Sequence, residues 1–309
     1  MAAGDQGYPS KICKVGIALQ GAKGTAKTAA DCTVFPLPAD ESLEYSLGDE
    51  ILNWGDGTAY AHEILQRIEA VNGGLTLPLI PGLTTDLATW VATEDAAFQG
   101  EWATICVDIA GVIKARYQDV KVGSAELVFV GNDTPRLNVT LAGLRYVDTS
   151  ADLSAVAAET TVPYKPSEQK FEIKLTGGAY ATTKLIQACT ITIDRKLESQ
   201  DDGAAIASQT YAEFLSSQGG LGVTGTFDRR MVDALRWADF LSGQLGALKI
   251  TLTRAANNEV IELPSIAYTP GGGAHAGPGD RIIKEAGVPF TAVSSGGDYT
   301  TAPLTWTPT

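Results

Sequence analysis

The residues that could carry out chemistry in this chain are few and scattered. Histidine, the commonest acid–base group near neutral pH, occurs only as His62 and His275. Both stand in segments typical of loops, WGDGTAYAHE and PGGGAHAGPG, and neither belongs to an HxxxH or HExxH pattern. We therefore expect solvated loop histidines, with a catalytic or metal-binding role as the weaker alternative.

An acidic group, Asp49, Glu50 and Asp56, lies in the segment LGDEILNWGDGTAY. It lacks the alternating Asp-x-Asp spacing of a calcium loop, so we expect a solvated or subunit-facing loop, with a cation site as the alternative. The segment GIALQGAKGT resembles a phosphate-binding loop, but Gly24 stands where Ser or Thr should bind magnesium. These patterns predict no cofactor, no metal and no enzymatic activity.

The four cysteines are far apart and form no CxxC pair: Cys13, Cys32, Cys106 and Cys189. Each falls in or beside a segment that has the pattern of a strand. We expect four reduced thiols that are buried like small apolar residues, with a disulfide or a metal site as the alternative.

The charge balance opposes tight binding to nucleic acid. The 309 residues include 23 basic and 36 acidic side chains, which gives a net charge of −13. Affinity for nucleic acid comes largely from Lys and Arg on phosphates, so this balance suits a surface that nucleic acid passes without sticking. The sequence shows neither an apolar signal segment nor a membrane span, so we expect a soluble protein that is not exported by the Sec route.

Runs that alternate apolar and polar residues dominate the chain and predict a mainly β fold. The predicted strands are 13–19, 42–47, 63–71, 104–109, 125–130, 137–147, 170–175, 188–197, 220–227, 248–253, 259–268 and 281–293.

Two segments carry helical spacing instead. Residues 83–98 place four apolar side chains on one face behind a pair of capping threonines. Residues 228–242 do the same behind Asp228, an expected N-cap, and stop before a glycine. Each predicted helix should pack on a sheet, with Trp90 and Leu235 buried.

These landmarks repeat along the chain. Gly-Gly-Leu precedes each predicted helix, at 73–75 and at 219–221, and the same offset of about 146 residues brings three pairs of predicted strands into register. The alternative is that two β-rich halves agree by chance. Residues 148–169 are rich in Ser, Ala, Thr and Pro and predict a linker. The predicted domains are 1–147 and 170–293, followed by a C-terminal arm at 294–309.

The first-half segments KVGIALQGAKGTAKTA, FPLPADESLEYSLGDE, GGLTLPLIPGL and TICVDIAG resemble the opening half of the major tail tube proteins of long-tailed, siphovirus-like bacteriophages. The later segments ACTITIDRKLESQDDG, GLGVTGTF, LKITLT and EVIELPSIAY resemble the second half of the larger, two-repeat members of that family. The likeness covers most of the range from Lys14 to Val293. It consists of strand patterns and turn glycines rather than an active site.

The resemblance implies two tandem β-sandwich or half-barrel domains, each with one flanking α-helix, whose inner sheets join those of neighbouring subunits around a lumen. It implies a structural subunit of stacked rings whose lumen conducts DNA during ejection without binding it specifically. Two repeats per chain imply a homotrimeric ring with pseudo-sixfold symmetry. The implied partners are further copies, the tape measure protein, and the tail terminator and distal tail proteins. The implied location is the virion tail, after assembly in the host cytoplasm.

Three sets of candidate residues follow from this reading. The loops 48–62 and 199–219 are candidates for ring stacking, through Asp49, Glu50, Trp54, Asp56, Tyr60, Tyr211 and Phe214. Charges within strands are candidates for the lumen wall, with a solvent-facing outer position as the alternative: Glu44, Glu63, Glu69, Asp108, Glu172, Asp194 and Glu198. Leu304 and Trp306 are candidate anchors of an arm that we expect to be ordered only against a neighbouring subunit.

Two other classes of function remain as alternatives at this point. One is another structural part of a phage tail, such as a terminator, baseplate or decoration protein. The other is a β-rich enzyme or a carbohydrate-binding protein.

Overall fold

The structure is a computed structural model of the 309-residue chain. The residues that it describes are 13–36, 40–52, 63–93, 100–109, 113–148, 153, 155–157, 160–174, 178–183, 186–200, 214–217, 221–230, 246–268, 274–275, 284–294 and 301–309.

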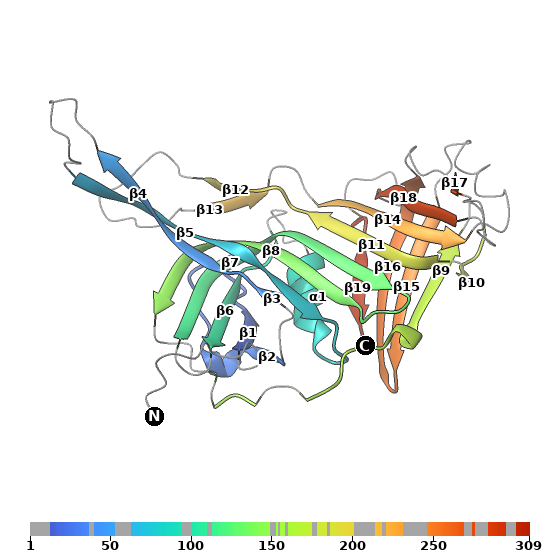
Figure 1. The fold of residues 1–309 in the computed structure, drawn as a ribbon, viewed down its shortest axis with the longest axis horizontal. Coiled ribbons are helices and arrows are strands. Elements are labelled where there is room, and N and C mark those ends of the chain that lie inside the picture. The colour runs from blue at the N-terminus through green and yellow to red at the C-terminus, as the bar shows by residue number, and fades with distance from the viewer. Residues whose placement is uncertain are drawn as a thin grey trace.

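The chain is mainly β, as the sequence predicts (Figure 1). The strands of the first half are β1 Cys13–Leu19, β2 Thr33–Pro36, β3 Asp40–Glu41, β4 Glu44–Leu52, β5 Glu63–Pro78, β6 Ala103–Ile109, β7 Ile113–Val130 and β8 Arg136–Asp148. Those of the second half are β9 Gln169–Lys174, β10 Ala181–Thr183, β11 Ile186–Asp194, β12 Leu197–Gln200, β13 Phe214–Ser217, β14 Gly222–Arg230, β15 Gly246–Arg254, β16 Asn257–Tyr268, β17 Ala274–His275, β18 Lys284–Ala292 and β19 Thr305–Pro308. The helical elements are α1 Thr84–Ala92 and the short 3₁₀ turns η2 Ala29–Asp31 and η3 Pro166–Glu168.

The two predicted helices differ in how they compare with the structure. The first exists as α1, but it ends at Ala92 because the backbone of Thr93 is extended, and its N-cap is Leu83 rather than a threonine. Trp90 on α1 is fully buried, as predicted. Residues 231–245, including Leu235, lie outside the described residues. The expected N-cap of the second helix is wrong, because Asp228 lies within strand β14.

Strand pairing follows one order in both halves of the chain. In the first half the antiparallel order is β2–β1–β6–β7–β8–β5–β4. In the second half it is β10–β9–β15–β16–β18–β14–β11. Short β17 pairs with β18, while β12 and β13 form a separate two-stranded sheet. Each strand in the first of these two orders therefore has a counterpart at the same place in the second.

The two halves are joined by direct strand pairing. The distal part of β7 pairs with β11 through seven residues, from Ser124 opposite Asp194 to Val130 opposite Ala188. This junction produces one antiparallel sheet that crosses both halves in the order β17–β18–β14–β11–β7–β8–β5–β4. We call it the shared sheet. It runs across the upper part of the molecule in Figure 1, where β11 connects the two sets of strands.

A hydrophobic core lies beneath the shared sheet and also draws on both halves. One contiguous cluster contains Leu77 from β5, Trp90 from α1, Ile191 from β11 and Phe290 from β18, each no more than 1% exposed. Helix α1 contributes four buried apolar residues to this cluster. The strands therefore pack around the helix, as expected for an amphipathic segment that has a sheet to cover it.

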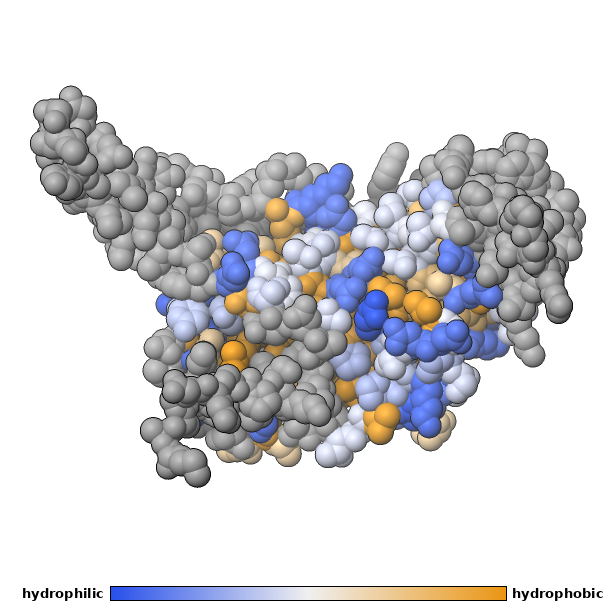
Figure 2. All heavy atoms as spheres, viewed as in Figure 1, coloured by the Kyte–Doolittle hydropathy of each residue, from blue (hydrophilic) through white to orange (hydrophobic). Residues whose placement is uncertain are grey.

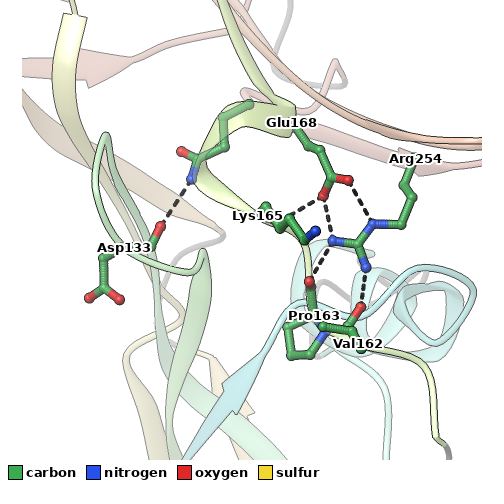
Figure 3. Close-up of polar contacts among 7 residues, drawn as sticks. Asp133, Val162, Pro163, Lys165, Glu168 and Arg254 are labelled. Carbon is green, nitrogen blue, oxygen red and sulfur yellow. Dashed lines mark hydrogen bonds and ion pairs between the residues drawn. The ribbon is translucent and has the colours of Figure 1, made fainter.

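Residues of the expected linker are held against the second half (Figure 3). Arg254 at the end of β15 donates to the Glu168 carboxylate at 2.8 Å, and to the carbonyl oxygens of Val162 and Pro163. Tyr164 is fully buried, and its backbone N–H donates to Leu79 O at 3.0 Å. The described part of residues 148–169 therefore packs against the folded chain and is not a free linker.

The described residues of the loops expected at 48–62 and 199–219 lie in strands. β4 continues to Leu52 and pairs with β5 from Glu63, and β12 pairs with β13, so the described part of each expected loop belongs to a β-hairpin. The β4–β5 hairpin extends beyond the body of the molecule in Figure 1. Its tip, 53–62, and that of the other hairpin, 201–213, lie outside the described residues. His275, expected in a loop, lies in β17, and His62 is outside the description.

No helix within the described ranges is both long and apolar enough to cross a membrane.

Candidate functional site

The shared sheet has one apolar face and one polar face. Alternate residues of β11, Cys189, Ile191 and Ile193, are buried in the core. The intervening residues Thr190 and Thr192 are only half-buried on the opposite side. The same alternation continues across the paired strands, because antiparallel partners share a face. We call the second side the polar face. Its described members are Ser42, Glu44, Asn72, Thr76, Ser124, Glu126, Asn138, Thr140, Thr190, Thr192, Asp194, Thr224, Thr226, Asp228 and Thr291.

The polar face carries a net negative charge. Its described acidic side chains are Glu44, Glu126, Asp194 and Asp228, from four different strands. The basic side chain at its described edge is Arg136, which pairs with Asp133 at 3.2 Å. Hydroxyl and amide groups fill most positions between the charges. A polyanion passing this face meets carboxylates and neutral hydrogen-bonding groups instead of free cations.

Local contacts hold the polar side chains in place. Asn138 Nδ2 donates to Glu126 Oε2 at 2.8 Å across the β7–β8 pair. The Asp228 carboxylate accepts from the backbone N–H of Gly287 at 2.7 Å, which ties β14 to β18. Two hollows follow this face, one in each half, and they are lined mainly by Thr, Ser, Asn and Gly. The charges thus belong to a wall of paired strands rather than to a mobile loop.

The structure distributes the expected lumen residues over three regions. Glu44, which is exposed, and Asp194 lie on the polar face. Asp108 on β6 is 3% exposed, and Glu172 on β9 pairs with Lys170 at 2.9 Å; both strands lie outside the shared sheet. The others lie in hairpin strands whose side chains are not described: Glu63 and Glu69 in β5, and Glu198 in β12.

The expected ring-stacking residues map onto the two hairpins. Asp49 and Glu50 are in β4, and Phe214 begins β13. Trp54, Asp56, Tyr60 and Tyr211 fall in the hairpin tips, outside the described residues.

The expectation that the C-terminal arm is ordered only against a neighbour is wrong. Leu304 and Trp306 are 1% and 8% exposed within the chain itself. β19 pairs with β16, from Glu259 opposite Pro308 to Glu262 opposite Thr305. Trp306 Nε1 also donates to Glu259 Oε2 at 3.4 Å. Both residues are anchors, but they fix the arm within its own chain, where β19 pairs with β16 of the second half and contacts α1 of the first half.

Two acidic residues of the polar face were not among the sequence candidates, Glu126 and Asp228. The signal for Asp228 is present in the sequence, because GVTGTFD alternates Thr, Thr and Asp as ACTITID does around Asp194. The helical reading of the following segment concealed it. Glu126 stands alone between apolar residues, and only the pairing of β7 with β11 places it on the polar face.

The cysteines that are described in full agree with the sequence expectation. Cys32, Cys106 and Cys189 are free and buried, while the side chain of Cys13 lies outside the description.

Comparison with known families gives one match to the chain. A family model described as phage tail tube protein matches residues 18–308, nearly the whole length. A comparison of the sequence with curated proteins gives no match.

Proposed function

The chain belongs to the phage tail tube protein family, and on this premise we propose that three copies form a ring whose polar face surrounds the path of DNA. Membership in the family makes the chain a structural component of a virion tail that associates with further copies into a tube. The observation that carries the finer proposal is the shared sheet, which already joins two equivalent halves edge to edge within one chain.

The polar face suits the inner wall of such a tube. Duplex DNA carries about one negative charge per 1.7 Å of its axis, so it is repelled by the carboxylates of Glu44, Glu126, Asp194 and Asp228. Salt screens this repulsion beyond about 8 to 10 Å, so it acts only on DNA that comes close to the wall. Hydroxyl-rich positions between these charges provide a hydrated surface, and the one basic side chain at its described edge, Arg136, is paired with Asp133. DNA then passes during ejection without specific binding.

The register of the strands supports two repeats of one domain. In the first half, Val120, Gly143, Val71 and Tyr45 stand opposite one another across β7, β8, β5 and β4. The corresponding row in the second half is Ile266, Ala292, Val223 and Ile193, across β16, β18, β14 and β11. The bulge between Ala103 and Ile105 in β6 also has a counterpart, between Gly246 and Leu248 in β15. We assign the repeats to residues 1–147 and 170–293.

The junction inside the chain predicts the junction between chains. Thr190 of β11 stands opposite Val128 of β7 at the internal junction. Ser42 lies three residues before Tyr45, and Thr190 lies three residues before Ile193, so Ser42 is the counterpart of Thr190. Ala274 pairs with Glu285, seven residues before Ala292, while Arg136 lies seven residues before Gly143 and pairs with Val128. Ala274 is therefore the counterpart of Val128.

Both edges that would form the second junction lack a strand partner among the described residues. β4 pairs with β5 alone, and β17 pairs with β18 alone. An edge strand offers unpaired N–H and C=O groups to another chain. We therefore infer that the edge formed by β3, Ser42 and the start of β4 in one copy adds to the β17 edge of the next, with Ser42 opposite Ala274. Three chains then supply six equivalent sheets and close the ring with pseudo-sixfold symmetry.

The hairpins β4–β5 and β12–β13 are our candidates for contact between stacked rings, since they occupy equivalent places in the two repeats and the first extends beyond the body (Figure 1). Figure 2 shows hydrophilic and apolar residues interspersed over the described part of the visible face.

Beyond further copies, we propose the tape measure, tail terminator and distal tail proteins as partners, in a siphovirus-like tail assembled in the host cytoplasm.

Engineered disulfides test the ring. A cysteine pair at directly opposed strand positions forms a disulfide readily, since the Cα atoms lie within the permitted range. In the double variant S42C/A274C, mild oxidation of assembled protein should give covalent dimers and trimers on a non-reducing gel, with no larger closed species. The intrachain counterpart T190C/V128C is the positive control and should cross-link within monomers. Each single variant should stay monomeric on the gel.

Two failures can be told apart. Tubes seen by negative-stain microscopy without S42C/A274C cross-links would overturn the register while preserving the tube. Protein that remains a small oligomer at all concentrations, in tests with purified full-length chain, would overturn the proposed function itself.

A further inference from the structure

A pair of buried thiols lies in the first half, away from the polar face. Cys32 follows η2 and immediately precedes β2, and Cys106 lies in the middle of β6. They are 7% and 0% exposed, and they share a small cluster with Ala18, Ala29 and Val34.

Gly16 of β1 makes the contact between the two cysteines possible. It stands directly opposite Cys106 in the β1–β6 pair, and a Cβ atom added to it would lie 2.8 Å from Cys32 Cβ and 3.4 Å from Cys32 Sγ. Directly opposed residues have Cβ atoms about 4.5 to 5.5 Å apart. The space left by the missing side chain therefore admits Cys32 beside Cys106, and the two thiols are close enough to share a hydrogen bond.

The surroundings also differentiate the two sulfurs. Arg116 of β7 stands opposite Cys106 on the other side of β6, so a cation lies beside this thiol. The pKa of Cys106 is lowered, first by a hydrogen bond from Cys32, although burial opposes this shift. Cys32 Sγ lies 3.5 Å from the carbonyl oxygen of Thr28. A lowered pKa and a neighbouring thiol are the features of a cysteine that reacts and is then resolved.

We propose that Cys32 and Cys106 are an oxidation site, which peroxide converts from two free thiols into a disulfide that ties the start of β2 to β6. The Cys106 thiolate attacks one peroxide oxygen; an S–O bond forms, the O–O bond breaks, and the leaving hydroxide takes up a proton as water. Sulfur is oxidised to the sulfenic acid and peroxide is reduced. Cys32 sulfur then attacks Cys106 sulfur, an S–S bond forms, and the leaving hydroxide takes the Cys32 proton as a second water.

The small size of the oxidant matters, because both thiols are almost inaccessible. Leu153 from the linker covers the pair, with its Cδ2 atom 3.1 Å from the position of a Gly16 Cβ. Lys14 Nζ donates to Leu153 O at 3.2 Å and holds this cover in place. Because hydrogen peroxide is much smaller than a disulfide reagent, we expect it to reach the pair after a smaller displacement of Leu153.

Mass spectrometry of the full-length chain tests the site. After mild hydrogen peroxide treatment of folded protein, the intact mass should fall by about 2 Da, through loss of two hydrogen atoms, and return on reduction. A non-reduced peptide map should join the peptides that contain Cys32 and Cys106. In C32S the linkage should vanish, and dimedone present while the oxidised protein is denatured should trap the sulfenic acid on Cys106.

C189S is the matched control, because Cys189 is a buried free thiol on β11 outside this cluster. It should retain the full mass loss and the same peptide link. A link that involves Cys13 or Cys189, or stepwise oxygen addition with no link in the wild-type chain, would overturn the proposal. The peptide map of the wild-type protein decides the question even where C32S fails to fold.

Discussion

Glu259 is a buried carboxylic acid at a point where four segments meet. It lies in β16 and is 1% exposed, beside the hydroxyl groups of Thr84 in α1 and Tyr164 in the linker and the indole of Trp306 in β19. Burial raises the pKa of Glu259 to about 7, although these three neighbours favour the charged form. Arg254 lies beside this cluster, with its guanidinium 5.5 Å from the centre of the Tyr164 ring, and it binds Glu168 instead.

Because the pKa of Glu259 is raised, its contribution to the free energy of unfolding should decrease as the pH rises. The folded chain holds the Glu259 proton more tightly than the unfolded chain, so the contribution is complete below about pH 4.5 and is lost as pH rises to about 7. In E259Q this loss should be absent. Urea unfolding from pH 4.5 to 8 should show the wild type losing up to about 3 kcal/mol relative to E259Q.

E44Q provides the comparison at the same net charge, because Glu44 is exposed on the polar face. Its stability should follow that of the wild type across the whole range. Parallel curves for E259Q and wild type would show that Glu259 titrates in the folded protein as it does in the unfolded one.

Strand β19 has only four residues, but we expect it to contribute strongly to the stability of the fold. Its four residues alternate, so Trp306 is buried while Thr305 and Thr307 are exposed. Replacing Trp306 with Ala removes the indole that packs on the core and bonds Glu259, and should cost about 3 to 5 kcal/mol in the free energy of unfolding. T307A, one residue along the same strand, should stay within about 0.5 kcal/mol. Similar losses in denaturant titrations of both variants would contradict the docking of β19.

The sequence predicted elements well where alternation is sustained and poorly where it is short. Each of the twelve predicted runs contains or overlaps a strand, including long β8 and β16. β3, β10 and β17 were missed because two or three residues cannot establish a period. β19 was seen as a tail since its partner, β16, is more than thirty residues earlier in sequence and nothing local indicates the pairing. The first part of β7 was missed because Gln118, Asp119 and Lys121 are buried polar residues within it.

The acidic residues of the polar face could be predicted only in part, because the strands that form this face are set by long-range pairing. Glu44 and Asp194 were found because each is a charge within an alternating strand. Asp108 has the same local pattern, yet it lies in β6, outside the shared sheet. Which strands enter that sheet depends on the pairing of β7 with β11, a contact between distant segments that no local pattern encodes.

At the scale of the whole molecule, Arg195 fixes the two halves to each other. It follows β11 in the second half and is 1% exposed, and its Nη2 donates to Val91 O and Thr93 O at the end of α1, each at 2.8 Å. A cation at these carbonyls also complements the negative end of the helix dipole. Gly100 packs against the guanidinium, since a Cβ added there would lie 2.7 Å from Nη1.

R195M keeps the length of this side chain and removes its donors, so the buried Val91 carbonyl and the partly buried Thr93 carbonyl lose their partner. We expect a loss of about 2 to 4 kcal/mol in the free energy of unfolding. Because the bonds cross the junction, amide hydrogen exchange should accelerate in both α1 and β11. R136M is the matched control, since Arg136 pairs with Asp133 at an exposed edge and should change stability by no more than about 0.5 kcal/mol. Faster exchange confined to β11 would mean that the halves are held together by strand pairing alone, and that Arg195 has no part in coupling them.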